Sequence, residues 1–416
     1  MKILQVNKFH YPRGGADKYF LWLSQALREA GHEVAVFSMA HPKNLPTPWS
    51  RYFVSRISFN EGDLKDKLKA PGRIFYSFSV RKNFSRLLKD FKPDIIHIHN
   101  IYHHLSPSLL DAARQCKIPV IMHLHDYHLI SPDYNLKEIT AFEKLKKPYQ
   151  YLGGRVIKNS RAATALAVLE HYFHQSILKI YRRNTNLFIA PSHFIKEIML
   201  KAGWPEKRIE IVYNPYSPDL AELNTLNNNG DSLATEEGAP KESYLISYGR
   251  LSAEKGIAIL IKAAALSNKK VKIVGNGPEE DKLKKLALEL KAPIEFLGFK
   301  ETDELRPLIE KAEAVVVPSV CAENMSLSLL EALSLGKPVI AAKIGGIPEA
   351  IKDGENGLLF TAGDAADLAE KIKHLDKLDL IAFSQNARAS AAHFTPEKNL
   401  NSILEIYQKI LNSKNA

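Results

Sequence analysis

The segment from Ala314 to Ala342 constrains the fold more than any other part of the chain. It begins with a short β-branched run that Pro318 and Ser319 close, and it ends with a second apolar run that starts at Pro338. Short apolar runs of this kind are typical of strands buried on both faces of a parallel sheet. The segment therefore predicts two buried strands joined by a loop and a helix.

The loop and the helix carry two carboxylates, Glu323 and Glu331, eight residues apart. The helix should begin near Ser326 or Ser328 and stop at Gly336. Glu323 then lies on the entry loop and Glu331 inside the helix. Both can face the crevice at the carboxyl end of a parallel sheet, where open α/β sheets bind ligands.

The same crevice suits a ligand with both hydroxyl and phosphate groups. Carboxylates accept hydrogen bonds from sugar and ribose hydroxyls, and backbone N–H groups from Asn324 to Leu327 would suit an anion at the helix start. On spacing alone an alternative stays open, in which Glu331 is a solvated helix residue and Glu323 an ordinary loop acid.

Length and cysteine content bound the class of protein. A chain of 416 residues is too long for one ordinary core and predicts two domains. Its two cysteines, Cys116 and Cys321, lie far apart without metal-type spacing, which predicts reduced thiols in the cytoplasm. We also expect no secretory signal and no membrane span, because no stretch reaches the roughly 18 apolar residues that a span needs.

Positive charge is concentrated in the first half of the chain. Residues 1–215 hold 33 Lys and Arg against 17 Asp and Glu, whereas the whole chain has a net charge of +11. Such a surplus favours an anionic partner, namely a phosphorylated acceptor, a lipid surface or nucleic acid. A merely soluble basic surface is the alternative, because no long run of Lys and Arg occurs.

One part of this basic half suggests a membrane contact. The stretch from Phe75 to Phe91 is amphipathic and predicts a helix within the region Arg51 to Lys92. Basic residues accompany aromatic ones there, a pattern of helices that lie on anionic membranes, although the aromatic residues could equally belong to the core. The residues are Arg73, Arg81, Lys82, Arg86 and Lys89, beside Phe75, Phe78 and Phe84.

The start of the chain has the pattern that opens a doubly wound sheet. A strand from Lys2 to Val6, a turn with Gly14 and Gly15, a helix from Tyr19 to Ala30 and a strand from Val34 to Phe37 follow one another. The glycine pair lets the backbone approach a ligand closely at a helix start, although ordinary tight turns also use glycine.

Histidines gather at the ends of the next two predicted strands, Asp94 to His99 and Val120 to Leu124. They lack the helical spacing of a metalloprotease motif, so we predict no metal site. His125, at the carboxyl end of a central strand, should point into the same crevice as Gly15. A purely structural histidine is the alternative.

The second half begins with a strand from Tyr244 to Tyr248, followed by Arg250 and Lys255. Across a strand-to-helix turn both cations can reach a diphosphate, Arg as a bidentate fork and Lys as a point charge. The alternative is a surface loop with a salt bridge to Glu254.

These segments resemble family-four glycosyltransferases, which are retaining enzymes of the GT-B architecture. The resemblance is carried by Glu323 and Glu331 as an E-x7-E signature, by the run HLHDYH around His125, and by the loop from Arg250 to Lys255. It implies an α/β fold of two doubly wound, Rossmann-like domains that face a cleft. It also implies Glu323, His125, Arg250 and Lys255 as catalytic residues.

The resemblance further implies a set of residues that bind a nucleotide sugar. Glu323 would contact the sugar, Glu331 the ribose, and the backbone near Gly298 the base. Many members have Pro-Phe-Gly after the first glutamate, where this chain has Asn-Met-Ser, so the sugar stays open. The implied donor-binding residues are Gly14, Gly15, Arg250, Lys255, Gly275, Asn276, Gly298, Met325, Ser326, Leu327 and Glu331.

The expected function is therefore retaining transfer of a hexosyl unit from a nucleotide diphosphate sugar to a saccharide acceptor, free or lipid-linked, in cell-surface polysaccharide or glycolipid synthesis. We expect no nucleic-acid partner, no cofactor and no metal, because Arg250 and Lys255 would replace the metal. A non-catalytic subunit that binds a sugar nucleotide is the alternative.

The expected domains are an acceptor-side domain over residues 1–215, a linker over 216–242, a nucleotide-sugar domain over 243–393 and a final helix over 394–416 that packs back on the first domain. We expect the enzyme in the cytoplasm, peripheral on the inner face of the membrane.

Overall fold

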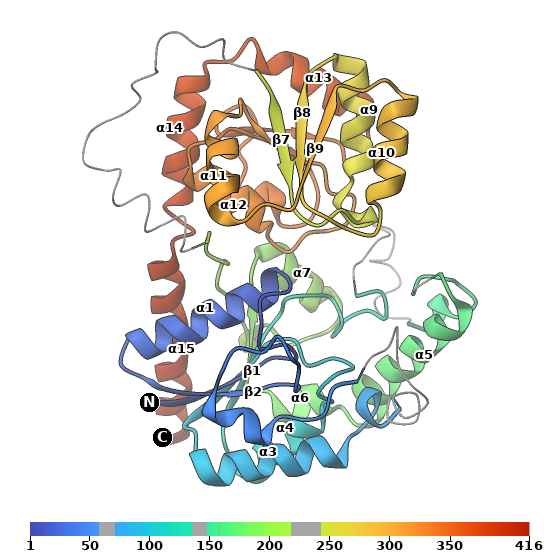
Figure 1. Ribbon diagram of the computed structural model, residues 1–416. Helices are drawn as coiled ribbons and strands as arrows, with labels where there is room; N and C mark the ends of the chain where they lie inside the picture. The colour runs from blue at the N-terminus through green and yellow to red at the C-terminus, as the bar shows by residue number, and fades with distance from the viewer. Residues whose placement is uncertain (58–70, 135–147, 158, 218–242, 416) are drawn as a thin grey trace. The chain divides into compact units, whose positions relative to one another are not determined.

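The computed structural model describes residues 1–57, 71–134, 148–157, 159–217 and 243–415. It divides into two compact units, each with a six-stranded sheet (Figure 1). Of the described residues, those up to Val212 and residues 400–415 form the first unit, and those from Tyr213 to Asn399 form the second. Each unit is described by itself.

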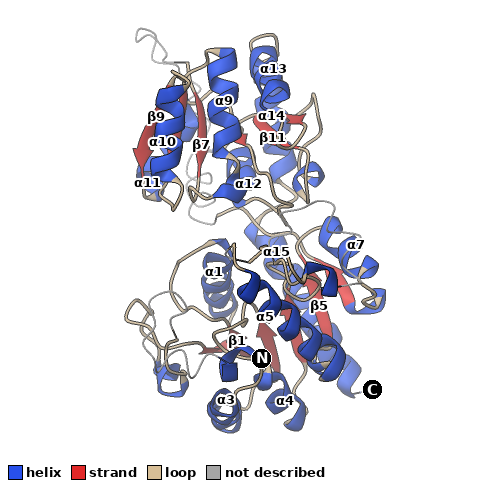
Figure 2. Cartoon of the chain, turned by 90° about the vertical axis from the view of Figure 1, so that its right-hand side faces the viewer, coloured by secondary structure: helices blue, strands red, loops and turns tan. Residues whose placement is uncertain are grey.

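The first sheet is entirely parallel, with strand order β2-β1-β3-β4-β5-β6. Its strands are β1 (Lys2–Val6), β2 (Glu33–Phe37), β3 (Ile95–Ile98), β4 (Val120–His123), β5 (Leu187–Ala190) and β6 (Ile209–Ile211). Its helices are α1 (Gly15–Glu29), α3 (Phe78–Phe91), α4 (Ser108–Gln115), α5 (Arg161–Tyr172), α6 (Ile180–Asn184), α7 (His193–Lys201) and α15 (Pro396–Asn415). Helices on both faces bury the sheet (Figure 2), which explains why its strands are mostly apolar.

The last helix, α15, completes the core of this first unit. Ile403 and Tyr407 are fully buried in a cluster with Ile3 and Leu27. The Tyr407 hydroxyl also reaches the middle of the sheet, where it accepts a 3.2 Å hydrogen bond from Gln5. The end of the chain is thus part of the first unit's interior.

The second sheet is also parallel, with order β12-β11-β10-β7-β8-β9. Its strands are β7 (Leu245–Tyr248), β8 (Val271–Val274), β9 (Ile294–Gly298), β10 (Val315–Val317), β11 (Val339–Ala342) and β12 (Gly357–Phe360). Its helices are α9 (Ile257–Ser267), α10 (Glu280–Glu289), α11 (Thr302–Lys311), α12 (Leu327–Ser334), α13 (Ala365–Leu375) and α14 (Leu380–Ala391). The predicted class of two doubly wound parallel sheets is confirmed.

Two local features depart from simple expectation. α5 does not run on as one regular helix, because it passes into a π-helical segment, Phe173–Ile177, and Lys179 then adopts a left-handed φ of 50°. Arg73 does not face solvent: its guanidinium is buried and donates 2.8 Å and 3.2 Å hydrogen bonds to the carbonyl oxygens of His104 and Ser55.

The proposed membrane helix exists, but part of its aromatic face belongs to the core. Phe84 is fully buried and packs edge-to-face on Phe37. Phe78 is 75% exposed, near the exposed Lys82 and Arg86. Within the described residues, no helix combines the length and apolar character required to cross a bilayer.

Candidate active site

The order of the second sheet places the loops after β7 and β10 at a topological switch point. β7 pairs with β8 on one side and with β10 on the other, so the chain leaves these two neighbouring strands in opposite directions. Loops that diverge in this way open a crevice at the carboxyl edge of the sheet. Lys255 follows β7 and Glu323 follows β10, and this topology brings them together.

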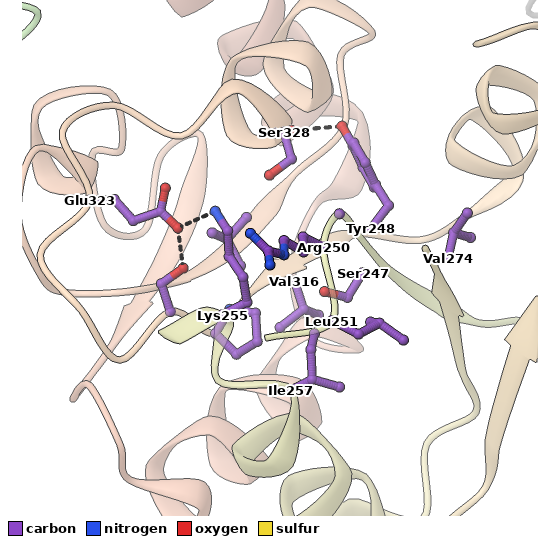
Figure 3. A pocket seen from close by; sticks show the side chains of 14 residues that line it. Ser247, Tyr248, Arg250, Leu251, Lys255, Ile257, Val274, Val316, Glu323 and Ser328 are labelled. Carbon is purple, nitrogen blue, oxygen red and sulfur yellow. Dashed lines mark hydrogen bonds and ion pairs between the residues drawn. The ribbon is translucent and has the colours of Figure 1, made fainter. Parts of the chain in front are cut away.

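A partly buried ion pair occupies that crevice (Figure 3). Lys255 Nζ lies 2.8 Å from Glu323 Oε1, and the Ser319 hydroxyl donates to the same oxygen. The Glu323 side chain is only 10% exposed, whereas that of Lys255 is 37% exposed. Lys255 therefore holds the carboxylate from the open side of the pocket.

The pair shifts both pKa values toward the charged forms. Burial alone would raise the pKa of Glu323, but the charge and hydrogen bond of Lys255, helped by Ser319, hold it below its ordinary value. Burial alone would lower the pKa of Lys255, and Glu323 reverses this and raises it. A carboxylate and an ammonium ion thus face the pocket at neutral pH.

Arg250 supplies a second cation to the same pocket, which Tyr248, Lys255, Glu323 and Ser328 also line (Figure 3). Among the described residues its guanidinium has no side-chain partner, and the residue is exposed. The alternative of a surface loop with a salt bridge to Glu254 is not what the structure has, because Glu254 accepts a 2.6 Å hydrogen bond from Ser252 and Lys255 pairs with Glu323.

Glycines hold the loops of this pocket in close backbone contact. Gly256 has a φ of +69°, and a Cβ there would lie 1.8 Å from the carbonyl oxygen of Pro318. A Cβ on Gly275 would lie 1.9 Å from the carbonyl oxygen of Gly249. Only glycine fits either position without moving backbone.

Gly275, Asn276 and Gly298 hold these loops through main-chain hydrogen bonds. Leu251 N donates to Asn276 O at 3.0 Å, and Gly275 N donates to Gly298 O at 2.7 Å. These three predicted donor-binding residues thus fix the strand ends around the loop that carries Arg250.

The helix α12 begins at Leu327 with Ser326 at its N-cap, as expected. Met325 and Ser326 are buried, while Leu327 is half-buried. Glu331 lies on this helix against the phenol of Tyr248. Burial and the nearby carboxylate raise the pKa of Tyr248 well above its ordinary value. Tyr248 Oη also donates a 2.7 Å hydrogen bond to the carbonyl oxygen of Ser328, which ties α12 to β7.

The first unit holds the other predicted residues, beginning with His125 after β4. Its Nε2 lies 2.9 Å from Nδ1 of His99, whose Nε2 lies 2.8 Å from Oε1 of Gln5. Because the Gln5 oxygen can only accept, His99 carries its proton on Nε2 and accepts from His125 at Nδ1. His125 is thereby protonated on Nε2, and its Nδ1 keeps a lone pair.

Burial, together with the charge of Lys8, lowers the pKa of His125 to about 3. The ring is therefore neutral at physiological pH and can act as a hydrogen-bonding group. It is half-buried at the carboxyl end of β4. It also packs edge-to-face on Tyr19 of α1, with ring centroids 5.5 Å apart.

Gly14 and Gly15 lie at the start of the same helix, with Gly14 at its N-cap. Asp17, in the first turn of α1, is buried and accepts a 2.8 Å hydrogen bond from Asn7, which follows β1. Burial raises the pKa of Asp17 above its ordinary value. The glycine turn is thus anchored to the strand end by a buried polar pair.

Ser319, Tyr248, Gln5 and His99 were not among the predicted site residues. Ser319 directly follows a buried strand, a signal that could have identified it. The roles of Gln5 and His99 depend on contacts across the sheet that spacing along the chain does not reveal.

Two family models match the chain. The model described as Glycosyltransferase Family 4 matches residues 13–220, and the one described as Glycosyl transferases group 1 matches residues 232–390. Among curated proteins, the chain is 28% identical over 381 residues to sulfoquinovosyl transferase SQD2 of Arabidopsis thaliana, covering 89% of this chain and 65% of that protein.

Solved structures share the fold. HepE of Anabaena in complex with UDP and glucose has a TM-score of 0.66 at 22% identity, over 98% of this chain and 100% of that one. Sucrose-phosphate synthase of Thermosynechococcus elongatus has a TM-score of 0.69 at 19% identity, over 99% of each chain. The fold is that of GT-B glycosyltransferases, and the chain belongs to glycosyltransferase family 4.

Proposed function

We propose that this glycosyltransferase moves a hexosyl unit from a nucleotide diphosphate sugar to a saccharide acceptor and retains the anomeric configuration. The observation that carries the proposal is the pocket in which Lys255, Glu323 and Arg250 meet at the switch point of the second sheet. It offers two cations for a diphosphate and one carboxylate for sugar hydroxyls.

In the proposed reaction the bond between the anomeric carbon and the diphosphate oxygen breaks, while the acceptor hydroxyl oxygen bonds to the same face of that carbon. The acceptor proton goes to the departing diphosphate. Arg250 and Lys255 stabilise the negative charge that develops there, which is the role a divalent metal plays in other transferases. The transfer step then needs no metal and no cofactor.

The remaining residues bind the two substrates. Glu331 would hold the ribose, and the backbone N–H groups of Met325, Ser326 and Leu327 would hold sugar and diphosphate at the start of α12. In the first domain, Gly14, Gly15 and neutral His125 would contact substrate, and this domain would bind the acceptor.

The comparisons support the substrate class. HepE has been solved with UDP and glucose, and SQD2 is a sulfoquinovosyl transferase. We therefore assign the donor to nucleotide diphosphate sugars and the product to glycolipid or polysaccharide synthesis in the cytoplasm. The exposed Phe78, with Lys82 and Arg86 nearby, supports peripheral contact with an anionic membrane surface.

The test is turnover, after a thermal-shift screen of UDP, GDP and ADP sugars has identified a stabilising donor. That donor and a panel of saccharide and lipid-linked acceptors should yield nucleoside diphosphate and a product whose anomeric configuration, read by NMR, equals that of the donor. Binding without release of nucleoside diphosphate would instead indicate a non-catalytic binding subunit, and an inverted product would refute retention.

A further inference from the structure

We propose that His103, His128 and Glu170 bind a divalent transition-metal ion of the Zn²⁺ class at a structural site in the first domain. Their ligand atoms all lie within 4.8 Å of one another. They come from three separate segments: the loop after β3, the loop after β4, and helix α5. None of them belongs to the donor pocket.

The atoms already have the spacing of a metal site. Glu170 Oε2 lies 2.9 Å from His103 Nε2, and Glu170 Oε1 lies 3.3 Å from His128 Nε2. Neighbouring ligands of a tetrahedral zinc ion, at bond lengths of about 2.0–2.1 Å, are roughly 3.3 Å apart. Small side-chain movements would therefore place all three around one ion.

A further imidazole stands beside the cluster. His174 lies one turn after Glu170, in the π-helical segment, and its Nδ1 is 3.9 Å from Glu170 Oε1. Its Nε2 lies 2.8 Å from the carbonyl oxygen of Phe75, which requires the proton on Nε2. In the neutral ring the lone pair of Nδ1 is then available on the Glu170 side, and this backbone contact is the usual second partner of a metal-binding histidine.

The surroundings orient the ligands and leave one open side. The ring of His128 packs on Tyr102 with centroids 3.9 Å apart. The side chains of Glu170 and His128 are 3% and 11% exposed, and that of His103 is 33% exposed. A metal ion can therefore enter past His103 and end in a largely buried site.

The ligand chemistry selects the type of ion. Imidazole nitrogens with one carboxylate suit zinc and neighbouring first-row metals, whereas calcium and magnesium take oxygen ligands. The other close histidine group, His97, His99 and His123, does not make a comparable site. Its rings are stacked with interplanar angles of 13–19°, so in-plane lone pairs cannot converge on one ion.

A metal here would tie the β4 loop to α5. His128 lies three residues after His125, so the ion would fix the segment that presents His125 at the end of β4. The site is structural and leaves the metal-free transfer step unchanged.

The test measures Zn²⁺ binding by the 416-residue chain. A chelator first strips bound metal from the protein, and the chelator is then removed. Competition against a chromophoric chelator should show one tightly bound equivalent, and saturating Zn²⁺ should raise the melting temperature. Glu170→Gln and His103→Gln keep side-chain size and polarity, and each should weaken binding at least tenfold. His374→Ala, at an exposed histidine of α13, is the control and should bind as the wild type does.

Co²⁺ provides a second readout, because visible d–d bands report a four-coordinate nitrogen and oxygen environment, and they should disappear in Glu170→Gln. The metal-free melting temperature of each variant shows whether it has folded. The proposal would be overturned if the wild type bound no Zn²⁺ tightly, or if folded Glu170→Gln bound Zn²⁺ with wild-type affinity. Glu170 would then be a carboxylate hydrogen-bonded to histidines.

Discussion

Replacement of Lys255 by methionine removes the charge that opposes Glu323 and leaves a carboxylate that is only 10% exposed. Breaking a fully buried pair from one side costs about 3–5 kcal/mol, and an exposed pair is worth less than about 1 kcal/mol. Because Lys255 is 37% exposed, water screens part of the loss, and we expect about 2 kcal/mol. For a domain of this size that lowers the melting temperature by roughly 4–8 °C at pH 7.5.

The cost of Lys255→Met should depend on pH with a definite sign. In the wild type the pKa of Glu323 is depressed, so its contribution to stability is present above the ordinary pKa of a glutamate and is lost only as the pH falls through the folded value. Without Lys255, only the hydrogen bond from Ser319 opposes burial, so the pKa of Glu323 rises and the variant protonates Glu323 on folding at pH 4.5. The difference between the two proteins should therefore shrink from pH 7.5 to pH 4.5.

Differential scanning calorimetry at both pH values measures this difference. Lys262→Met, at an exposed lysine of α9, is the matched control and should change the melting temperature little at either pH. Adding Glu323→Gln to Lys255→Met removes the unpaired charge and should recover most of the lost stability. A loss that is equal at both pH values and does not recover in the double variant would show that Lys255 acts through packing alone.

Three further predictions concern activity and membranes. Glu323→Gln should lower kcat, while Glu331→Ala should mainly raise the donor KM; equal, small effects in both would contradict their assignment to sugar and ribose. His99→Phe should lower kcat at an unchanged donor KM, since His125 loses the acceptor that fixes its proton, and an unchanged kcat would make His99 structural. Lys82→Glu combined with Arg86→Glu should abolish co-sedimentation with anionic vesicles at low salt, which high salt should also weaken; recovery of the wild type in the supernatant under all conditions would refute membrane contact.

Local sequence patterns predicted the strands well, because a strand buried on both faces is mostly apolar. The strand from Lys2 to Val6 has the predicted bounds, and the strand predicted from Val34 to Phe37 begins one residue earlier, at Glu33. The start of α12 followed from Ser326, since a serine before an apolar periodic run is typical of a helix N-cap. Ser326 occupies that position. Within one segment, the residue types therefore largely determine where a strand or helix begins and ends.

Features that depend on distant partners were not predictable in this way. Arginine is mostly a surface residue, yet the Arg73 guanidinium is buried because it donates hydrogen bonds to the carbonyl oxygens of His104 and Ser55. The break after α5 accompanies a bond between His174 and the carbonyl of Phe75, 99 residues earlier in the chain. Spacing along the chain carries no information about such pairings.

The ion pair between Lys255 and Glu323 has the same origin, and it bears on how the pocket would bind a diphosphate. A lysine side chain loses about 2 kcal/mol of rotamer entropy when it is held in one place. Here the ion pair with Glu323 already restricts Lys255 in the free protein. An ammonium group has three protons, so it can keep its bond to Glu323 and still donate to phosphate oxygens. In the proposed donor complex the carboxylate would already hold the cation in place for the diphosphate, and part of the ordering cost of donor binding would be met during folding.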